Sequence, residues 1–97
     1  MILTTTNTIE GFKIIEYKGI VTGTSSDMKT KFSFKAQKNL EISSDVINKA
    51  QEEAFQQLKE NAKLLNANAV VGIKMDLENA QGSYFFVTVM GTAVSIA

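Results

Sequence analysis

The stretch Asn66-Ala-Asn-Ala-Val-Val-Gly-Ile-Lys-Met-Asp76 joins the end of a helix pattern to the start of a strand pattern, and it decides the fold class. Asn66 tolerates the left-handed conformation with which many helices end, so we expect the chain to leave the helix there. From Val71 onward, apolar residues alternate with polar or small ones, which is typical of a strand with one buried face. We predict that this face carries Val71, Ile73, Met75 and Leu77.

Upstream of this stretch, residues 45–65 have the spacing of an amphipathic helix. Ser43 or Ser44 can cap its first amides, and Asp45 suits the positive end of the helix dipole. Apolar side chains recur at steps of three and four residues and form the face that we expect to pack on a sheet: Ile47, Ala50, Ala54, Leu58, Ala62 and Leu65, widened by Phe55. Charged and amide side chains occupy the opposite, solvated side.

Three strands accompany this helix. The first spans residues 13–22, with Ile15, Tyr17 and Val21 expected on one face, and the others span residues 71–78 and 84–96, joined by a hairpin turn at 79–83. Short additional strands are expected at Ile2–Thr6 and around Phe32 and Phe34. The order strand, helix, strand, strand predicts an α+β fold in a single domain, residues 1–97, with a β-α-β-β core and an antiparallel sheet covered by one long helix.

The last strand differs from the others because both of its faces are apolar. Phe85, Val87, Val89 and Ala93 form one face, and Tyr84, Phe86, Met90, Val94 and Ile96 form the other. One helix covers one face, and leaving large apolar side chains in water forgoes roughly 1.5–3 kcal/mol for each that could be buried. We therefore predict that the second set lies at an interface between copies of the chain. The alternative is that the N-terminal segment and the Phe32–Phe34 arm fold across it within one subunit.

The composition argues against several classes of function. Ten Lys balance ten Asp and Glu, and Arg is absent, so neither the net charge nor the side chains favour nucleic acid or an anionic membrane. The absence of His and Cys removes the usual general base and the commonest ligands for zinc, copper and nickel, so we expect no enzyme and no cofactor. The start of the chain lacks a signal-peptide pattern, and no apolar run approaches the ~18 residues of a membrane span, which predicts a cytoplasmic protein.

Few side chains remain as candidates for chemistry. Asp76 and Glu78 stand two residues apart on one predicted strand, so their carboxylates share a face and could hold a hard cation where copies meet. A solvated strand end has the same pattern, so we expect no metal site in the isolated chain, and we expect Met75 to pack in the core. The hydroxyl-rich runs Thr4–Asn7 and Thr24–Asp27 could bind a small polar ligand, although such runs more often satisfy turns.

Two blocks of the sequence resemble the YbjQ family of small bacterial proteins, which carries a heavy-metal-binding label. The first block is Met1–Gly11 with Ile14, Glu16, Tyr17 and Gly19–Gly23; the second is Ala67–Ile73 with Asp76, Val87–Val89 and Gly91–Val94. The resemblance implies a subunit of the dodecin type, assembled into a ring, a pentamer, with additional short strands that help to join the subunits. It also implies that Thr4–Thr6 and the Phe32–Phe34 arm lie at subunit contacts.

One segment departs from the family pattern. Relatives carry an Ile-Arg-Asp element and a Gly-Gly-Arg-Ser-Gly-like loop between the first strand and the helix, whereas residues 24–44 are shorter here and contain neither Gly nor Arg. The chain therefore resembles a divergent member of the family. Whatever that loop does in relatives, this chain cannot do it with the same groups.

These observations support three hypotheses for the function. The first is a non-enzymatic homo-oligomer that binds a small ligand or ion at subunit interfaces or in a central pore. The second is a structural or protein-interaction subunit without a small ligand, in which residues 24–44 present the contact surface. The third is a carboxylate-based hydrolase, which the absence of His disfavours.

Overall fold

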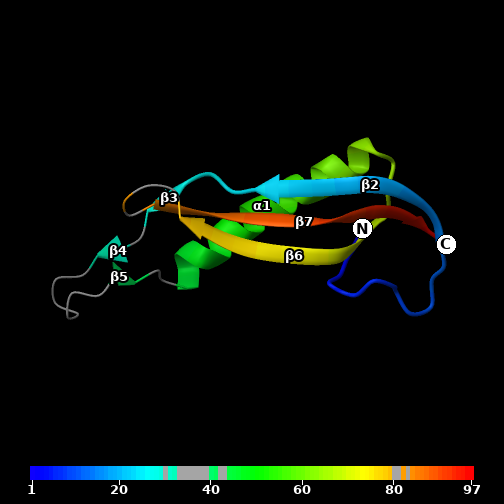
Figure 1. The fold of residues 1–97 in the computed structure, drawn as a ribbon, viewed down its shortest axis with the longest axis horizontal. Helices are drawn as coiled ribbons and strands as arrows, with labels where there is room; N and C mark the ends of the chain where they lie inside the picture. Colours follow the sequence, from blue (N-terminus) through cyan, green and yellow to red (C-terminus); the bar gives the residue numbers. More distant parts are fainter. Residues whose placement is uncertain (30, 33–39, 42–43, 80–81, 83) are drawn as a thin grey trace.

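The computed structural model describes residues 1–29, 31–32, 40–41, 44–79, 82 and 84–97 of the chain. One helix, α1 (Ser44–Leu64), lies against one face of a sheet formed mainly by three long strands, β2 (Ile14–Thr24), β6 (Ala69–Asn79) and β7 (Tyr84–Ile96) (Figure 1). The short strands are β1 (Ile2–Leu3), β3 (Met28–Lys29), β4 (Lys31–Phe32) and β5 (Leu40–Glu41). The predicted α+β class with a β-α-β-β core is confirmed.

Strand β7 lies at the centre of the sheet. Its neighbours β6 and β2 both run antiparallel to it, and β3 pairs with β7 along the same edge as β2. Strand β1 adds to the outer side of β6 in the parallel sense, so the sheet as a whole is mixed, while its three long strands are antiparallel to their neighbours, as predicted. In the described chain, β4 and β5 pair with each other in a separate two-stranded sheet, which projects beyond one end of the main sheet (Figure 1). Ser43 and Phe34 lie outside the described residues.

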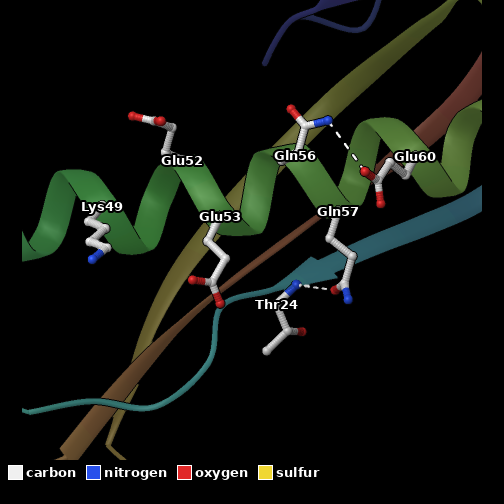
Figure 2. A pocket seen from close by; sticks show the side chains of 7 residues that line it. All are labelled: Thr24, Lys49, Glu52, Glu53, Gln56, Gln57 and Glu60. Atoms are coloured by element: carbon white, nitrogen blue, oxygen red, sulfur yellow. Dashed lines mark hydrogen bonds between the residues drawn. The ribbon is translucent and has the colours of Figure 1, made fainter.

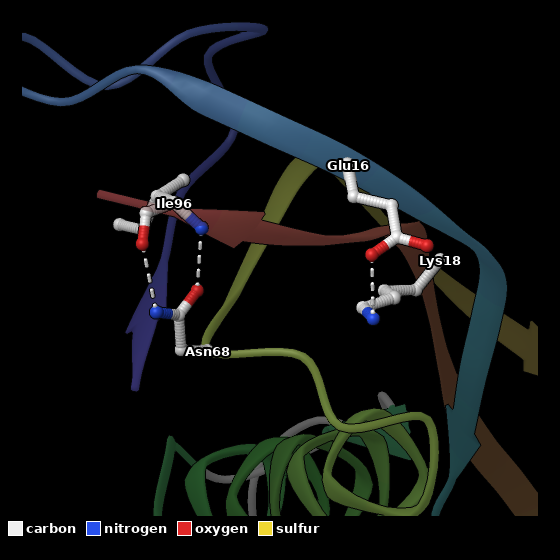
Figure 3. A network of polar contacts seen from close by, with 4 residues as sticks. All are labelled: Glu16, Lys18, Asn68 and Ile96. Carbon is white, nitrogen blue, oxygen red and sulfur yellow. Dashed lines mark hydrogen bonds and ion pairs between the residues drawn. The ribbon is translucent and has the colours of Figure 1, made fainter.

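The helix ends where the sequence predicts, at Asn66, which has a φ of 61°. The N–H of Ala67 donates to the carbonyl of Ala62 at 3.1 Å, and the N–H of Asn66 donates to the carbonyl of Lys63 at 2.9 Å, the two bonds of a Schellman motif. Asn68 then bonds both backbone groups of Ile96 through its side-chain amide, at 2.7 and 3.0 Å (Figure 3). Together these bonds fix the direction in which the chain enters β6.

Small side chains bring α1 close to the sheet. Ala50, Ala54, Leu58 and Ala62 recur every four residues along the helix and are fully buried. They pack over β2 and β7, where they meet the predicted inner face of β7: Phe85, Val87, Val89 and Ala93. This cluster is the main core.

Gly23 of β2 lies directly under the helix. A Cβ atom at this position would overlap the carbonyl oxygen of Ala54 and would lie 2.7 Å from the amide nitrogen of Leu58. Both of these are backbone atoms, so the contact cannot be relieved by a side-chain rotation. Glycine at position 23 is therefore required for the observed distance between helix and strand.

A β-bulge in β6 changes which side chains share a face. Val71 pairs with Thr92 and Lys74 pairs with Met90, so Gly72 and Ile73 together oppose one residue of β7. Gly72 has a φ of 63°, the left-handed conformation that a bulge of this type requires.

Because of the bulge, the four residues predicted to form the buried face of β6 do not share one buried face. Ile73 joins the main core, but Val71 points to the opposite face of the sheet. Met75 and Leu77 stay about half exposed, because α1 packs over β2 and β7 rather than over β6. The expectation that Met75 packs in the core is therefore wrong.

Strand β2 also departs from the predicted alternation, since it contains two irregularities within its first half. Val21 is buried in the main core, whereas Ile15 and Tyr17 are exposed. The prediction that these three share one face is wrong, since Tyr17 lies opposite Val94 of the second core and Val21 lies in the main core. Glu16 and Lys18, beside the irregular stretch, form an ion pair at 2.9 Å (Figure 3).

A second, smaller core forms on the face of the sheet opposite to the helix, which we call the outer face. Val94 and Ile96 of β7 and Ala69 and Val71 of β6 are buried there. Ile9 and Ile14, which flank the turn before β2, cover them. The N-terminal segment thus buries one end of the outer face within a single chain.

The contact at Gly23 yields a first prediction. Gly23→Ala should destabilise the fold by about 1–3 kcal/mol, the usual range for overpacking, because the added methyl group must displace the helix backbone. Urea denaturation followed by circular dichroism measures the change. Thr24→Ala is the matched control, since Thr24 is exposed on the same strand; equal stability of the two variants would show that the helix shifts at no cost.

Candidate functional site

The predicted cation ligands Asp76 and Glu78 are exposed on the outer face of β6, where Asp76 pairs with Thr88 and Glu78 with Phe86. Their carboxylates share a face, as the spacing predicts. Among the described residues, no group of three or more His, Cys, Asp or Glu side chains could hold a metal ion. Hard cations take six or more oxygen ligands, so this pair in one chain supplies too few.

Two shallow hollows lie on the outer face, with volumes of about 230 and 290 Å³, and Lys74 and Met90 border both. Ile20 and Thr92 border the first hollow; Thr22, Thr24, Asp76 and Thr88 border the second. This part of the outer face therefore combines hydroxyl groups and both signs of charge with exposed apolar side chains.

The predicted interface residues fall into two groups. Tyr84 and Met90 are exposed, and Phe86 is partly exposed. Val94 is fully buried, and Ile96 is 8% exposed, because the N-terminal segment covers them. The outer face is thus closed at one end within the chain, as the alternative supposed, and open at the other.

Both hydroxyl-rich runs bond the backbone around them. The hydroxyl of Thr6 donates to the carbonyl of Thr8 at 2.6 Å and lies 2.8 Å from the hydroxyl of Thr4. Ser25 is buried, and its hydroxyl accepts the N–H of Val87 at 2.9 Å. These are the bonds that such residues supply in turns and at strand ends. The turn interpretation therefore fits both runs better than a ligand site.

A row of polar side chains on α1 forms hydrogen bonds with the backbone at the free edge of β2. The sequence patterns did not identify this row. Strand β2 lies at the edge of the sheet, so its outward backbone groups lack a strand partner. Three helix side chains, four residues apart, supply the bonds: Asn61 donates to the carbonyl of Thr22 at 2.8 Å, Gln57 accepts the N–H of Thr24 at 2.7 Å (Figure 2), and Glu53 accepts the N–H of Ser26. We call Glu53, Gln57 and Asn61 the edge-capping row.

A hollow of about 490 Å³ lies beside this row, between α1 and the end of β2. Figure 2 shows Glu53 and Gln57 pointing toward the strand, while Glu52 and Gln56 point away from it. Gln56 bonds Glu60 at 3.5 Å along the helix surface. The side chains that face the strand already form hydrogen bonds with its backbone. The polar groups of this hollow therefore stabilise the fold and are not free to bind a ligand.

The electrostatics of the row centre on Glu53. The hydrogen bond from the backbone N–H of Ser26 lowers the pKa of the Glu53 carboxyl below its ordinary value, and the Ser26 side chain and the Lys49 ammonium act in the same direction. Partial desolvation opposes them but is the smaller effect. Glu53 therefore stays ionised in moderately acidic solution. Its hydrogen bond to Ser26 stabilises the segment that connects β2 to β3.

Fold and surface together define a small α+β domain, with one helix on a mixed sheet and an outer face that is half covered. The whole chain, residues 1–97, matches the family model YbjQ, which is described as "Putative heavy-metal-binding". The chain belongs to the YbjQ family.

Relatives match over the full length. A UPF0145 protein of Clostridium kluyveri is 41% identical over 106 residues, and one of Acetivibrio thermocellus is 38% identical over 106 residues, each match covering 99% of both chains. A crystal structure from Pediococcus pentosaceus, a DUF74-family protein of unknown function, has a TM-score of 0.64 and 25% identity and covers 100% of this chain and 98% of its own. In the described part of the present chain, no helix is long and apolar enough to span a membrane.

The lowered pKa of Glu53 yields a second prediction. Because the folded-state value lies below the unfolded value of about 4.3, the stabilisation is complete above that pH and is lost as pH falls through the folded value. Urea midpoints measured from neutral pH to about pH 3 should therefore decline less steeply in Glu53→Gln, which keeps an acceptor without the charge. Glu52→Gln, one residue away and pointing from the strand, should follow the unmodified chain. Parallel profiles for all three proteins would contradict the prediction.

Proposed function

We propose that this chain is the subunit of a non-enzymatic homo-oligomer that binds a small ligand or ion where subunits meet or in a central pore. The open part of the outer face carries the proposal: Tyr17, Ile20 and Met90 expose 69%, 74% and 49% of their surfaces there. Exposed apolar groups gathered on one face usually mark an interface or a binding site. A ring of five is the form that the family resemblance implies, and a cytoplasmic location is what the sequence predicts.

The chemistry of this face suits a polar ligand or a hard cation better than a heavy metal. Threonine hydroxyls and the charges of Lys74 and Asp76 border its hollows. Around a symmetry axis, copies of Asp76 and Glu78 would supply the carboxylate oxygens that one chain lacks. Zinc, copper and their neighbours bind thiolate or imidazole, and the chain contains neither Cys nor His. For a heavy metal the chain therefore offers only Met thioethers and carboxylates.

The arm formed by β4 and β5 favours the second candidate, a structural or protein-interaction subunit. In the described chain these strands pair with each other alone and project beyond the main sheet (Figure 1). A two-stranded unit is marginally stable by itself in water. Contact with another protein would stabilise the arm without any small ligand.

Native mass spectrometry of the protein purified from its own host tests the proposal. We expect an oligomer that retains a small molecule. If the ligand is an ion, isothermal titration should show heat from calcium or magnesium and none from zinc, copper or nickel. An oligomer that contains a co-purifying polypeptide and no small ligand would support the structural role instead. A monomer by light scattering at micromolar concentration would contradict the homo-oligomer.

A third prediction concerns the open outer face. Met90→Asp and Phe86→Asp should each reduce the mass measured by size-exclusion chromatography with light scattering, since each would place a charge in the proposed interface. Asn48→Asp, on the exposed side of α1, is the matched control and should keep the full mass. If both outer-face variants keep the full mass while remaining folded, this face is not the interface.

A further inference from the structure

In the described part of the chain, the backbone groups at the outward edge of β2 are hydrogen-bonded along the second half of the strand and unpaired along the first half. The edge-capping row bonds the backbone at Thr22, Thr24 and Ser26. Backbone groups of a strand alternate in direction, so Ile20, two residues before Thr22, presents its N–H and carbonyl at the same edge. Four residues after Asn61 the next position of the row is Leu65, which follows the end of the helix and has no polar side-chain atom. Within the described residues, nothing bonds this first half of the edge.

The outward edge of β6 shows the opposite pattern, with its first half bonded and its second half open. The N-terminal segment bonds Val70, Gly72 and Ile73 through Thr4 and Thr6, at 2.8 to 3.1 Å. Beyond Ile73, no strand of the described chain pairs with this edge.

These two open stretches lie on opposite edges and at opposite ends of one sheet. Residues 15–20 of β2 align through β7 with the first half of β6, whereas the open stretch of β6 is residues 74–79. Each stretch has six residues; the stretch of β6 is about 20 Å long at the usual rise of a strand, and that of β2 is shorter because its two irregularities lie there. Since β2 and β6 are both antiparallel to β7, they run in the same direction. A second copy, displaced along the sheet, can therefore set one stretch beside the other in the parallel sense.

We propose that a second copy of this chain occupies these edges, with residues 15–20 of one copy pairing in parallel with residues 74–79 of the next. The proposal rests on the homo-oligomer proposed above and names the surfaces that join it. An unpaired strand edge is a template for another strand, and the edge of β6 already accepts a parallel strand, β1, within the chain.

Side chains at the two edges support the same pairing. Ile15 and Ile20 are exposed along one open stretch, and Met75 and Leu77 are about half exposed along the other. A neighbouring strand would cover part of each side chain: Met75 and Leu77 on the helix side of the sheet and Ile20 on the outer face. Because each copy offers a different surface to each neighbour, the contact is heterologous, and it forms a ring if the rotation between copies closes.

Cysteine cross-linking tests this pairing, because the chain contains no Cys of its own. Ile20 and Glu78 both point to the outer face, and the proposed register places them beside each other, where Cα atoms on adjacent strands lie within the range that a disulfide spans. Mild oxidation of Ile20→Cys/Glu78→Cys should give covalent multimers, while either single variant should give none. The pairs Ile20→Cys/Asp76→Cys and Ile20→Cys/Lys74→Cys test registers shifted by two and four residues, and Ile20→Cys/Asn48→Cys, with its second thiol on the exposed helix surface, is the control.

Two results would overturn the assignment. A dimer formed by Ile20→Cys alone would show a two-fold contact of β2 with itself. Absence of cross-links from all three strand pairs, in a protein that light scattering shows to be oligomeric, would refute these edges and leave the oligomer standing. A monomeric protein would refute the proposed homo-oligomer as well.

Ile20→Pro provides a measurement that does not depend on register. Proline removes the outward N–H and leaves the bonds to β7, which neighbouring residues make. We expect a smaller mass by light scattering with an unchanged far-ultraviolet circular dichroism spectrum. Ile20→Ala keeps the N–H and should stay assembled, so it separates backbone pairing from burial of the side chain. Full mass for a folded Ile20→Pro would contradict the pairing.

Discussion

Helix α1 lies against β2 at a distance that a side chain at Gly23 would not permit. The alanines of the helix face allow this approach, since they fill the space between helix and sheet without holding the two apart. At this distance the side chains of Glu53, Gln57 and Asn61 reach the backbone of the strand and bond its outer edge. The same close contact leaves the far half of β6 uncovered, because one helix placed over β2 and β7 cannot also cover β6.

Both edges of the sheet are therefore closed over half of their length by the chain itself, and by different means. Side chains of the helix close part of β2, whereas the backbone of the N-terminal segment closes part of β6. Unpaired edges invite other strands, and proteins usually cover or charge them. In a subunit that assembles, the halves left open are the parts of the surface best suited to join neighbouring copies.

Chemistry on the outer face is modest in any single copy. Asp76 and Glu78 stand together as the spacing predicts, but no third ligand joins them among the described residues. The hydroxyl groups of Thr6 and Ser25 bond the local backbone. A hard-cation site built on Asp76 and Glu78 would therefore need further ligands, such as those of a second copy.

Sequence by itself determined the features that depend on neighbouring residues: the helix and its buried face, the stop at Asn66, and the two apolar faces of the last strand. Tertiary structure decided the rest. Side chains in a strand alternate with a period of two, so the single extra residue at Gly72 moved Val71 to the other face, and such a bulge exists only through pairing with β7. Burial of Val94 depended on the distant N-terminal segment, and the function of the edge-capping row became visible once β2 was known to lie at an edge. Apart from the adjacency of β6 and β7, which the turn at 79–83 predicts, local patterns carry little information about strand order or register, because both arise from contacts between residues far apart in the chain.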